Sequence, residues 1–290
     1  MLAKSTVFYL THLILAMNAT SVICRAAPKI IGGHPVSIKH RPFMLSLHSA
    51  DGFLCGASIL SRNWGITALH CFCTRWCFCR LSEETNYFLY AMVFLQTFRG
   101  DELLLSEETN YFVRAGSNRL DQGGSLHRVT KMHAYNDSTY QYWFSSMLYH
   151  DIALFEVRPR FRFSSRVRSV RLPRESSEPP RQLYVCGWGY TGIQSSPLVS
   201  NILRGVIVSH TPYETCVNET IDYTLLVKKE NHLCYGTRGK DSCYGDSGGP
   251  LASGTTLYGI VSFGHNCAIV SGIYENVSYY RRWIKQITNL

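Results

Sequence analysis

Short apolar or alternating runs, each bounded by turn-forming residues, recur along most of this 290-residue chain. Such runs occupy residues 43–48, 65–69, 183–186, 203–208 and 257–263. Runs of this length and spacing are typical of strands, and they suit antiparallel sheets or barrels better than alternating strands and helices. The pattern therefore predicts an all-β chain.

The last stretch of the chain has a different period. Its apolar positions follow one face of a helix: Tyr280, Trp283, Ile284 and Ile287. Basic residues occupy the other faces of the same turn pattern. The spacing predicts one helix close to the C-terminus.

The first residues have the features of an export signal. Lys4 gives a basic start, residues 7–17 form a short apolar run, and small residues follow at Ala19, Ser21 and Ala26. A membrane anchor is the alternative, but it needs about 20 predominantly apolar residues, and this run is shorter. We therefore expect residues 1–24 to be a signal peptide, the protein to be secreted and extracellular, and the mature form to have no membrane span.

Composition and charge indicate the class of protein and the partners that it could bind. The chain is 46% hydrophobic and 17% charged, as in globular proteins, and its formal net charge is +9. A positive balance favours acidic partners, such as nucleic acid or sulfated glycans. Because an exported chain does not ordinarily meet nucleic acid, a sulfated glycan stays open as a partner and nucleic acid is not expected.

Eleven cysteines in an exported chain indicate disulfide bonds. The odd count leaves at least one cysteine lost with the signal peptide, free, or paired to another chain. Three glycosylation triplets, which begin at Asn136, Asn218 and Asn276, are compatible with a secreted glycoprotein.

One octapeptide is duplicated. Residues 81–88 recur unchanged as residues 105–112, at an offset of 24 residues. A single period is not a repeat array, so we interpret it as a tandem duplication or insertion in a surface loop within residues 73–112, with a functional insert as the alternative. The Cys-x-Cys pairs at 71–73 and 77–79 are tighter than structural zinc spacing, and we expect no metal and no cofactor.

The strongest chemical signal is Gly245-Asp246-Ser247-Gly248-Gly249-Pro250. A serine hydroxyl attacks well only when a base removes its proton and backbone donors hold the developing oxyanion, and glycines permit the sharp turn that this requires. Two further motifs supply the partners, Thr67-Ala68-Leu69-His70-Cys71 and Asp151-Ile152-Ala153-Leu154. The chain order of the reactive residues is His, Asp, Ser, one of the known orders of this triad.

With these motifs the chain resembles the trypsin branch of the chymotrypsin family from residue 30 to about residue 288. The resemblance implies two six-stranded antiparallel β-barrels with the active site between them, a C-terminal helix, and a peptidase domain over residues 30–290. It implies that His70 is the general base and then acid, that Asp151 orients it, and that Ser247 is the nucleophile. The backbone N–H groups of Gly245 and Ser247 would form the oxyanion hole.

The resemblance also implies activation by cleavage. Lys29 precedes Ile30-Ile31-Gly32-Gly33, so residues 25–29 would be a short activation peptide that another protease removes. In this family the freed isoleucine amine turns inward and pairs with the aspartate before the serine, which is Asp246 here.

The family position that sets specificity carries Asp241, six residues before Ser247. A carboxylate there implies cleavage after Arg or Lys. The other residues matched to the substrate pocket are Ser242, Ser262, Gly264 and Gly272.

By the same matching, three disulfides are implied: Cys55–Cys71, Cys216–Cys234 and Cys243–Cys267. Cys186 would be a buried free thiol. Three residues depart from the pattern: Leu69 beside the histidine, Phe263 in the pocket wall, and Tyr244 at the rim.

The sequence thus predicts a secreted serine endopeptidase zymogen, cut after Lys29, that hydrolyses protein or peptide substrates after Arg or Lys and meets an activating protease and protease inhibitors. The alternative is a catalytically impaired homologue that acts as a binding protein. An arginine-rich run over residues 158–174 is either a solvated connection between barrels or a site for a sulfated glycan.

Overall fold

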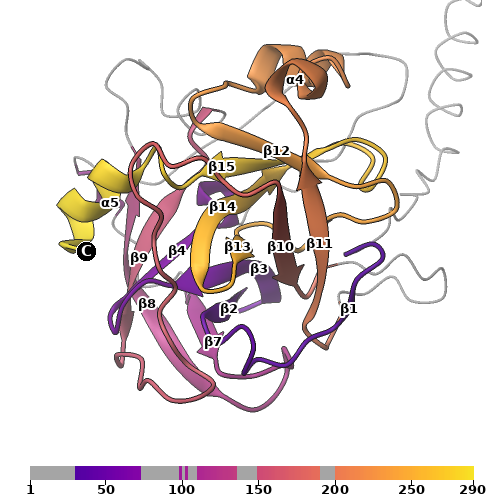
Figure 1. Cartoon of the computed structure of the whole chain (residues 1–290). Helices are drawn as coiled ribbons and strands as arrows, with labels where there is room; N and C mark the ends of the chain where they lie inside the picture. The colour runs from indigo at the N-terminus through magenta and orange to yellow at the C-terminus, as the bar shows by residue number, and fades with distance from the viewer. Residues whose placement is uncertain (1–29, 73–97, 100–101, 104–109, 136–148, 190–199) are drawn as a thin grey trace, which may run out of the picture.

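The computed structural model describes residues 30–72, 98–99, 102–103, 110–135, 149–189 and 200–290 (Figure 1). Two antiparallel sheets make up this part of the chain, and each sheet closes on itself. The all-β prediction is confirmed, and the five apolar runs each coincide with a strand or its edge.

The first sheet closes through the pairing of β8 with β9. Its six-stranded ring consists, in spatial order, of β2 (Met44–Ser49), β3 (Gly52–Ile59), β4 (Trp64–Thr67), β9 (Ala153–Arg158), β8 (Ser125–Ala134) and β7 (Phe112–Ala115). A small hairpin of β5 (Phe98–Arg99) and β6 (Glu102–Leu103) pairs with β8 outside that ring. Part of the segment between the two octapeptides therefore lies against the outer edge of this barrel.

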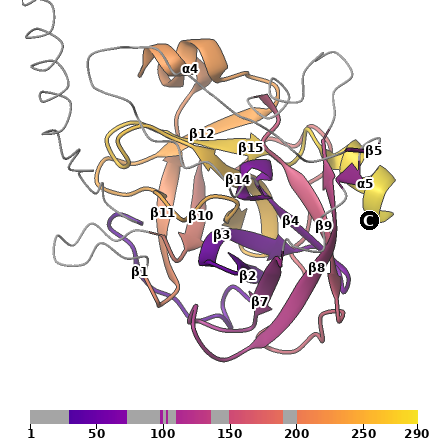
Figure 2. The same cartoon turned by 180° about the vertical axis from the view of Figure 1, so that it is seen from behind.

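The second sheet closes through the pairing of β11 with β12. Its six-stranded ring consists of β10 (Gln182–Gly187), β13 (Pro250–Ser253), β14 (Thr256–Phe263), β15 (Gly272–Asn276), β12 (His232–Gly236) and β11 (Arg204–His210). The short strand β1 (His34–Pro35) is added at β11. The prediction of two six-stranded barrels is thereby confirmed, and Figures 1 and 2 show the two barrels packed against each other.

Strand β8 shows how the sequence selects the inner face of a barrel. His127, Val129, Met132 and Ala134 are buried, while most residues between them are at least partly exposed. The alternation shifts by one residue at a bulge between Val129 and Lys131. Because side chains on a strand alternate with a period of two, this extra residue returns the apolar side chains to the core.

The helix α5 (Arg281–Thr288) confirms the prediction for the C-terminus. Its buried residues Trp283 and Ile284 belong to the core of the first barrel, although the helix follows the last strand of the second barrel (Figure 1). The helix therefore fastens the two barrels together.

Two short helices in the connection between β11 and β12 were not predicted, α3 (Tyr213–Cys216) and α4 (Ile221–Leu226). The Thr220 side chain caps α4 by accepting a hydrogen bond from the backbone N–H of Tyr223 at 3.1 Å. Both views place α4 beside β12, at the outer end of the second barrel (Figure 2). No helix in the described ranges is long and apolar enough to cross a membrane.

The contact between the barrels is close at two glycines. The backbone N–H of Gly56, in β3, donates to the carbonyl oxygen of Ser247 at 2.8 Å. A β-carbon at Gly56 would stand 2.8 Å from the Cα atom of Gly249, closer than such atoms approach in proteins. Glycine at both positions lets the turn that carries Ser247 lie directly on the first barrel.

Candidate active site

His70 and Asp151 come from neighbouring strands of the first barrel. His70 lies in a short 3₁₀ turn (Leu69–Phe72) after β4, and Asp151 lies just before β9. The register of these strands pairs Thr67 with Ala153. Because antiparallel pairing places the end of β4 beside the start of β9, both side chains reach the same rim of the barrel.

Asp151 is held by three donors. Its Oδ2 atom lies 2.6 Å from Nδ1 of His70, and its Oδ1 atom accepts from the backbone N–H of His70 at 2.8 Å. The Ser262 hydroxyl donates to Oδ2 at 2.6 Å. Since a carboxylate can only accept, the His70 proton sits on Nδ1, which leaves Nε2 as a proton acceptor.

His70 and Asp151 each shift the pKa of the other. Burial by itself lowers the pKa of His70, but the charge of Asp151 and its hydrogen bond outweigh burial and raise that pKa above its ordinary value. Burial by itself raises the pKa of Asp151, yet the charge and hydrogen bonds of His70, together with the Ser262 bond, lower it. The pair therefore favours an ionised Asp151 and an imidazole that accepts a proton readily.

Ser247 lies in the turn that precedes β13 of the second barrel. Gly245 and Gly248 lie on either side of it and have φ angles of +88° and +72°, which residues with a β-carbon rarely adopt. A β-carbon at Gly248 would collide with the Thr67 hydroxyl and stand 3.0 Å from the backbone nitrogen of Ala68. The turn therefore brings Ser247 against the segment that leads into His70.

Asp246 anchors this turn from inside. It is completely buried, and its side chain accepts from the backbone N–H groups of Gly189 at 2.8 Å and Cys243 at 3.0 Å. Among the described residues it forms no ion pair, and burial raises its pKa to about 7. Such a carboxylate is poised to gain a cationic partner. Gly245 and Ser247, whose N–H groups are the expected oxyanion donors, flank it.

Ile30, the expected first residue of the mature chain, is buried in the core of the second barrel. The next residue, Ile31, forms a β-bridge with Asp241. Both the serine turn and the expected pocket floor thus lie in the same barrel as the start of the peptidase domain. Lys29 lies outside the described residues, as do residues 1–28.

Asp241 lies at the floor of the expected substrate pocket and is 2% exposed. Its Oδ1 atom accepts from the backbone N–H of Ser242 at 2.8 Å, and its Oδ2 atom accepts from that of Ala268 at 3.0 Å. The Ser242 hydroxyl lies within hydrogen-bond distance of the hydroxyl of Tyr274, at 3.0 Å.

Two glycines of the expected pocket wall lie close to this carboxylate or to each other. A β-carbon at Gly272 would stand 3.0 Å from Oδ1 of Asp241, and a β-carbon at Gly264 would stand 3.7 Å from the Cα atom of Gly272. A side chain at Gly272 would therefore crowd the carboxylate of Asp241. Burial raises the pKa of Asp241 to about 7 despite its backbone hydrogen bonds. Among the described residues this buried carboxylate forms no ion pair.

All three expected disulfides form, Cys55–Cys71, Cys216–Cys234 and Cys243–Cys267. The first holds the strand next to the serine turn against the His70 turn, and the third joins the serine loop to the pocket wall. Cys55, His70 and Cys71 lie close enough together to suggest a metal cluster. Both sulfurs are committed to the disulfide, however, so this group does not fit a metal ion.

Cys186 is buried and free, as expected, and burial raises its thiol pKa to about 12. A thiol of that kind is inert. Cys24, Cys73, Cys77 and Cys79, and the first octapeptide copy, lie outside the described residues.

The three departures from the family pattern lie in different surroundings. Leu69 belongs to the core of the first barrel and is 1% exposed. Phe263 packs edge-on against the rings of Tyr223 and His232. Tyr244 is exposed at the rim.

One buried residue at the site was not predicted from the sequence. Glu275, in β15, accepts a hydrogen bond from the backbone N–H of Asp151 at 2.8 Å. No motif marks it, because its contact depends on the pairing of strands far apart in the sequence.

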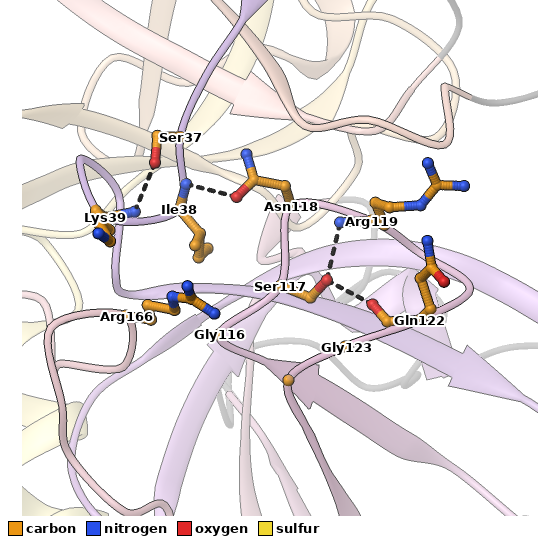
Figure 3. A pocket seen from close by; sticks show the side chains of 11 residues that line it. Ser37, Ile38, Lys39, Gly116, Ser117, Asn118, Arg119, Gln122, Gly123 and Arg166 are labelled. Atoms are coloured by element: carbon orange, nitrogen blue, oxygen red, sulfur yellow. Dashed lines mark hydrogen bonds between the residues drawn. The ribbon is translucent and has the colours of Figure 1, made fainter.

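A separate surface pocket lies away from these residues (Figure 3). It lies between residues 37–39 and the loop 116–124, and its lining includes Lys39, Arg119 and Arg166. Arg119 is paired with Asp121 at 3.1 Å. The pocket is basic, and none of the expected catalytic or substrate-binding residues lines it.

Comparisons with known proteins match this chain over most of its length. A family profile described as Trypsin matches residues 30–88 and 103–284. Trypsin 5G1 of Aedes aegypti is 30% identical over 311 residues, which cover 97% of this chain and 100% of that protein. Trypsin alpha of Drosophila melanogaster is 30% identical over 266 residues, covering 90% and 88%. Hypodermin-A of Hypoderma lineatum is 30% identical over 274 residues, covering 93% and 91%.

Proposed function

This chain belongs to the trypsin family of serine endopeptidases, and on that premise we propose that it is a secreted zymogen which, once cut after Lys29, hydrolyses peptide bonds that follow Arg or Lys. The observation that carries the proposal is the arrangement around His70, in which Nδ1 is bound to Asp151 at 2.6 Å while the serine turn packs against the preceding residues.

In the first half of the proposed reaction, Ser247 Oγ attacks the carbonyl carbon of the scissile bond and its proton passes to Nε2 of His70. The carbonyl oxygen becomes an oxyanion, which the N–H groups of Gly245 and Ser247 stabilise. The C–N bond then breaks, and the imidazolium gives its proton to the leaving amine. Asp151 stabilises the imidazolium throughout and is not itself protonated.

In the second half, a water molecule takes the place of the amine. His70 removes a proton from the water as its oxygen attacks the acyl carbon, and the same donors hold the second oxyanion. The ester bond to Ser247 then breaks, and His70 returns the proton to Oγ. The products are a carboxylic acid and the free enzyme, so no cofactor is consumed.

The preference for Arg or Lys rests on Asp241. A cation that enters the slot would meet a buried carboxylate with two backbone donors and no cationic partner among the described residues. Because the charge is desolvated, a substrate side chain without a cation would leave it unpaired. The absence of side chains at Gly264 and Gly272, near this carboxylate, supports the proposal that the long aliphatic part of the side chain enters here.

The zymogen hypothesis rests on Asp246 and Ile30. Asp246 is buried without an ion-pair partner in the described part of the chain, and Ile30 is buried in the same barrel. Cleavage after Lys29 would create an ammonium group at Ile30. An ion pair between this group and Asp246 would hold the turn that carries Gly245 and Ser247 in its active shape.

The expected partners are protein or peptide substrates, an activating protease and protease inhibitors. The sulfated glycan remains a further hypothesis. All seven arginines of the 158–174 run are exposed: Arg158, Arg160, Arg162, Arg166, Arg168, Arg171 and Arg174. Arg166 also lines the basic pocket of Figure 3 together with Lys39. Salt-sensitive retention on heparin, reduced by Arg166→Ala, would support this partner, and retention unchanged by that substitution would exclude the pocket.

The test of the proposed function is hydrolysis of short peptide amides by protein cleaved after Lys29, made with and without one 24-residue copy. We expect turnover of Arg and Lys amides and little turnover of Phe or Ala amides. The alternative, a catalytically impaired homologue that binds partners, is not favoured by the formed His70–Asp151 contact. A folded, cleaved protein that hydrolyses none of these amides would support that alternative.

A further inference from the structure

Glu275 is completely buried behind the expected catalytic aspartate, and two hydrogen-bond donors bind its carboxyl group. Its Oε1 atom accepts from the backbone N–H of Asp151 at 2.8 Å and lies 3.3 Å from Nε2 of His232. Its Oε2 atom accepts from the hydroxyl of Tyr280 at 2.5 Å. A carboxyl group with no access to solvent is costly unless such partners satisfy it.

The hydrogen bonds fix the proton positions around it. Nδ1 of His232 accepts from the backbone N–H of Lys228 at 2.9 Å, so the proton of a neutral His232 must be on Nε2, which faces Glu275. The Tyr280 oxygen already lies near the side-chain amide of Asn231 and Nδ1 of His150, so its own proton is directed to Glu275. The backbone N–H of Asp151 and the hydroxyl of Tyr280 each donate to one oxygen of Glu275, while Nε2 of His232 lies 3.3 Å away without a hydrogen bond, so Glu275 acts as an acceptor at both oxygens.

These contacts follow from the strand register. His232 in β12 is the direct cross-strand partner of Glu275 in β15, and the partner on the other side, in β14, is the aliphatic Ile260. The titratable groups that face Glu275 are therefore His232 from β12, Asp151 and, through Tyr280, His150 from the segment before β9, and Tyr280 from the segment before α5.

We propose that Glu275 is a positioning residue for the triad: it holds the backbone of Asp151 and places a second buried negative charge behind the His70–Asp151 pair. The proposal rests on the triad roles given above. Glu275 is in the second barrel and Asp151 in the first, so the contact also fixes the two barrels relative to each other at the catalytic rim.

Two consequences follow. If the N–H of Asp151 loses its acceptor, the carboxylate that orients His70 is less firmly held, and the chemical step slows while substrate binding in the Asp241 pocket is unaffected. If only the charge of Glu275 is removed, the imidazolium form of His70 loses an electrostatic partner. The pKa of His70 then falls, and the enzyme keeps its activity to lower pH.

Two variants of the activated full chain separate these effects. Glu275→Ala removes both the acceptor and the charge, whereas Glu275→Gln keeps an oxygen that can accept from Asp151. Glu230→Gln is the matched control, because it makes the same change at an exposed residue beside β12. The measurements are kcat and KM for an Arg amide over a range of pH, with an NMR titration of His70 as a readout that does not depend on turnover.

We expect Glu275→Ala to lower kcat about tenfold or more with KM changed less than about twofold. Glu275→Gln should move the acid limb of kcat/KM and the His70 titration to lower pH by about half a unit or more, and Glu230→Gln should do neither. If Glu275→Ala is not secreted, the Glu275→Gln profile decides. A wild-type kcat in Glu275→Ala, or an acid limb and a His70 titration that are unchanged in Glu275→Gln, would overturn the inference. A wild-type protein that folds and is cleaved but does not turn over would instead overturn the proposed function.

Discussion

The backbone N–H of Ile31 donates to the carbonyl oxygen of Asp241 at 3.0 Å, and the N–H of Asp241 donates back to Ile31 at 3.3 Å. This bridge joins the start of the peptidase domain to the floor of the substrate pocket. One residue earlier, Ile30 is buried in the second barrel, whose serine loop carries Asp246. The residues next to the proposed cleavage site are therefore in direct contact with the expected pocket floor, and they lie in the same barrel as the serine turn.

Lys29→Gln should give a folded, secreted precursor without activity. The activating protease would no longer cut before Ile30, so no amine would be available to pair with Asp246. Secreted yield and amide hydrolysis after treatment with a Lys-directed protease measure this directly, with wild-type protein treated in parallel. Full activity of the variant would rule out the zymogen mechanism.

Asp241→Ser should lower kcat/KM for Arg and Lys amides at least about thirtyfold. The substrate cation would lose its buried partner, and loss of one member of such a pair costs about 2–5 kcal/mol. Cleavage of substrates with uncharged side chains should change much less. Steady-state kinetics on matched Arg and uncharged amides provide the comparison, and a variant that kept its original margin for Arg would place the specificity determinant elsewhere.

Binding of a cationic aryl amidine should weaken as the pH falls through about 7. The amidine binds the ionised form of Asp241, whose pKa burial raises to about 7. Below that pH the carboxyl is increasingly protonated in the free protein, so affinity should fall about tenfold per pH unit. Titrations between pH 5 and pH 8 test the slope, and Asp241→Ser should bind weakly with a much flatter profile. A flat profile in the wild-type protein would show that Asp241 stays ionised throughout.

The sequence predicted most of the fold because its strands and its C-terminal helix left local signals, and the candidate reactive residues lie in recognisable motifs. Residues 43–48 and 257–263 have the length of strands, and Tyr280, Trp283 and Ile284 have helical spacing. The two barrels came from the resemblance carried by His70, Asp151 and Ser247, and the structure confirms them.

Other features had no such signal. Glu275 is one acidic residue in an apolar strand, and only the register of β12 against β15 brings it to His232 and the N–H of Asp151. The helices α3 and α4 are too short for a helical period to be visible. For α4 the only local sign is the cap at Thr220.

Deletion of residues 81–104 should leave activity unchanged or raise it. The deletion joins Arg80 to the second octapeptide copy and keeps β7 (Phe112–Ala115) in the ring, while β5 and β6, which it removes, lie outside the ring. It also removes the apolar run 87–95, an aggregation hazard when exposed. Secreted yield should therefore rise. A deletion protein that misfolds beside an active full-length form would show that the segment is structural or functional.

The central claim is that His70 and Asp151 activate Ser247, and covalent labelling of the cleaved protein by a fluorophosphonate tests it most directly. Only a base-activated serine reacts quickly with this reagent. We expect rapid labelling of one residue, located by mass spectrometry at Ser247, with loss of both labelling and amide turnover in Ser247→Ala. Labelling at another residue, or full turnover by Ser247→Ala, would contradict the account.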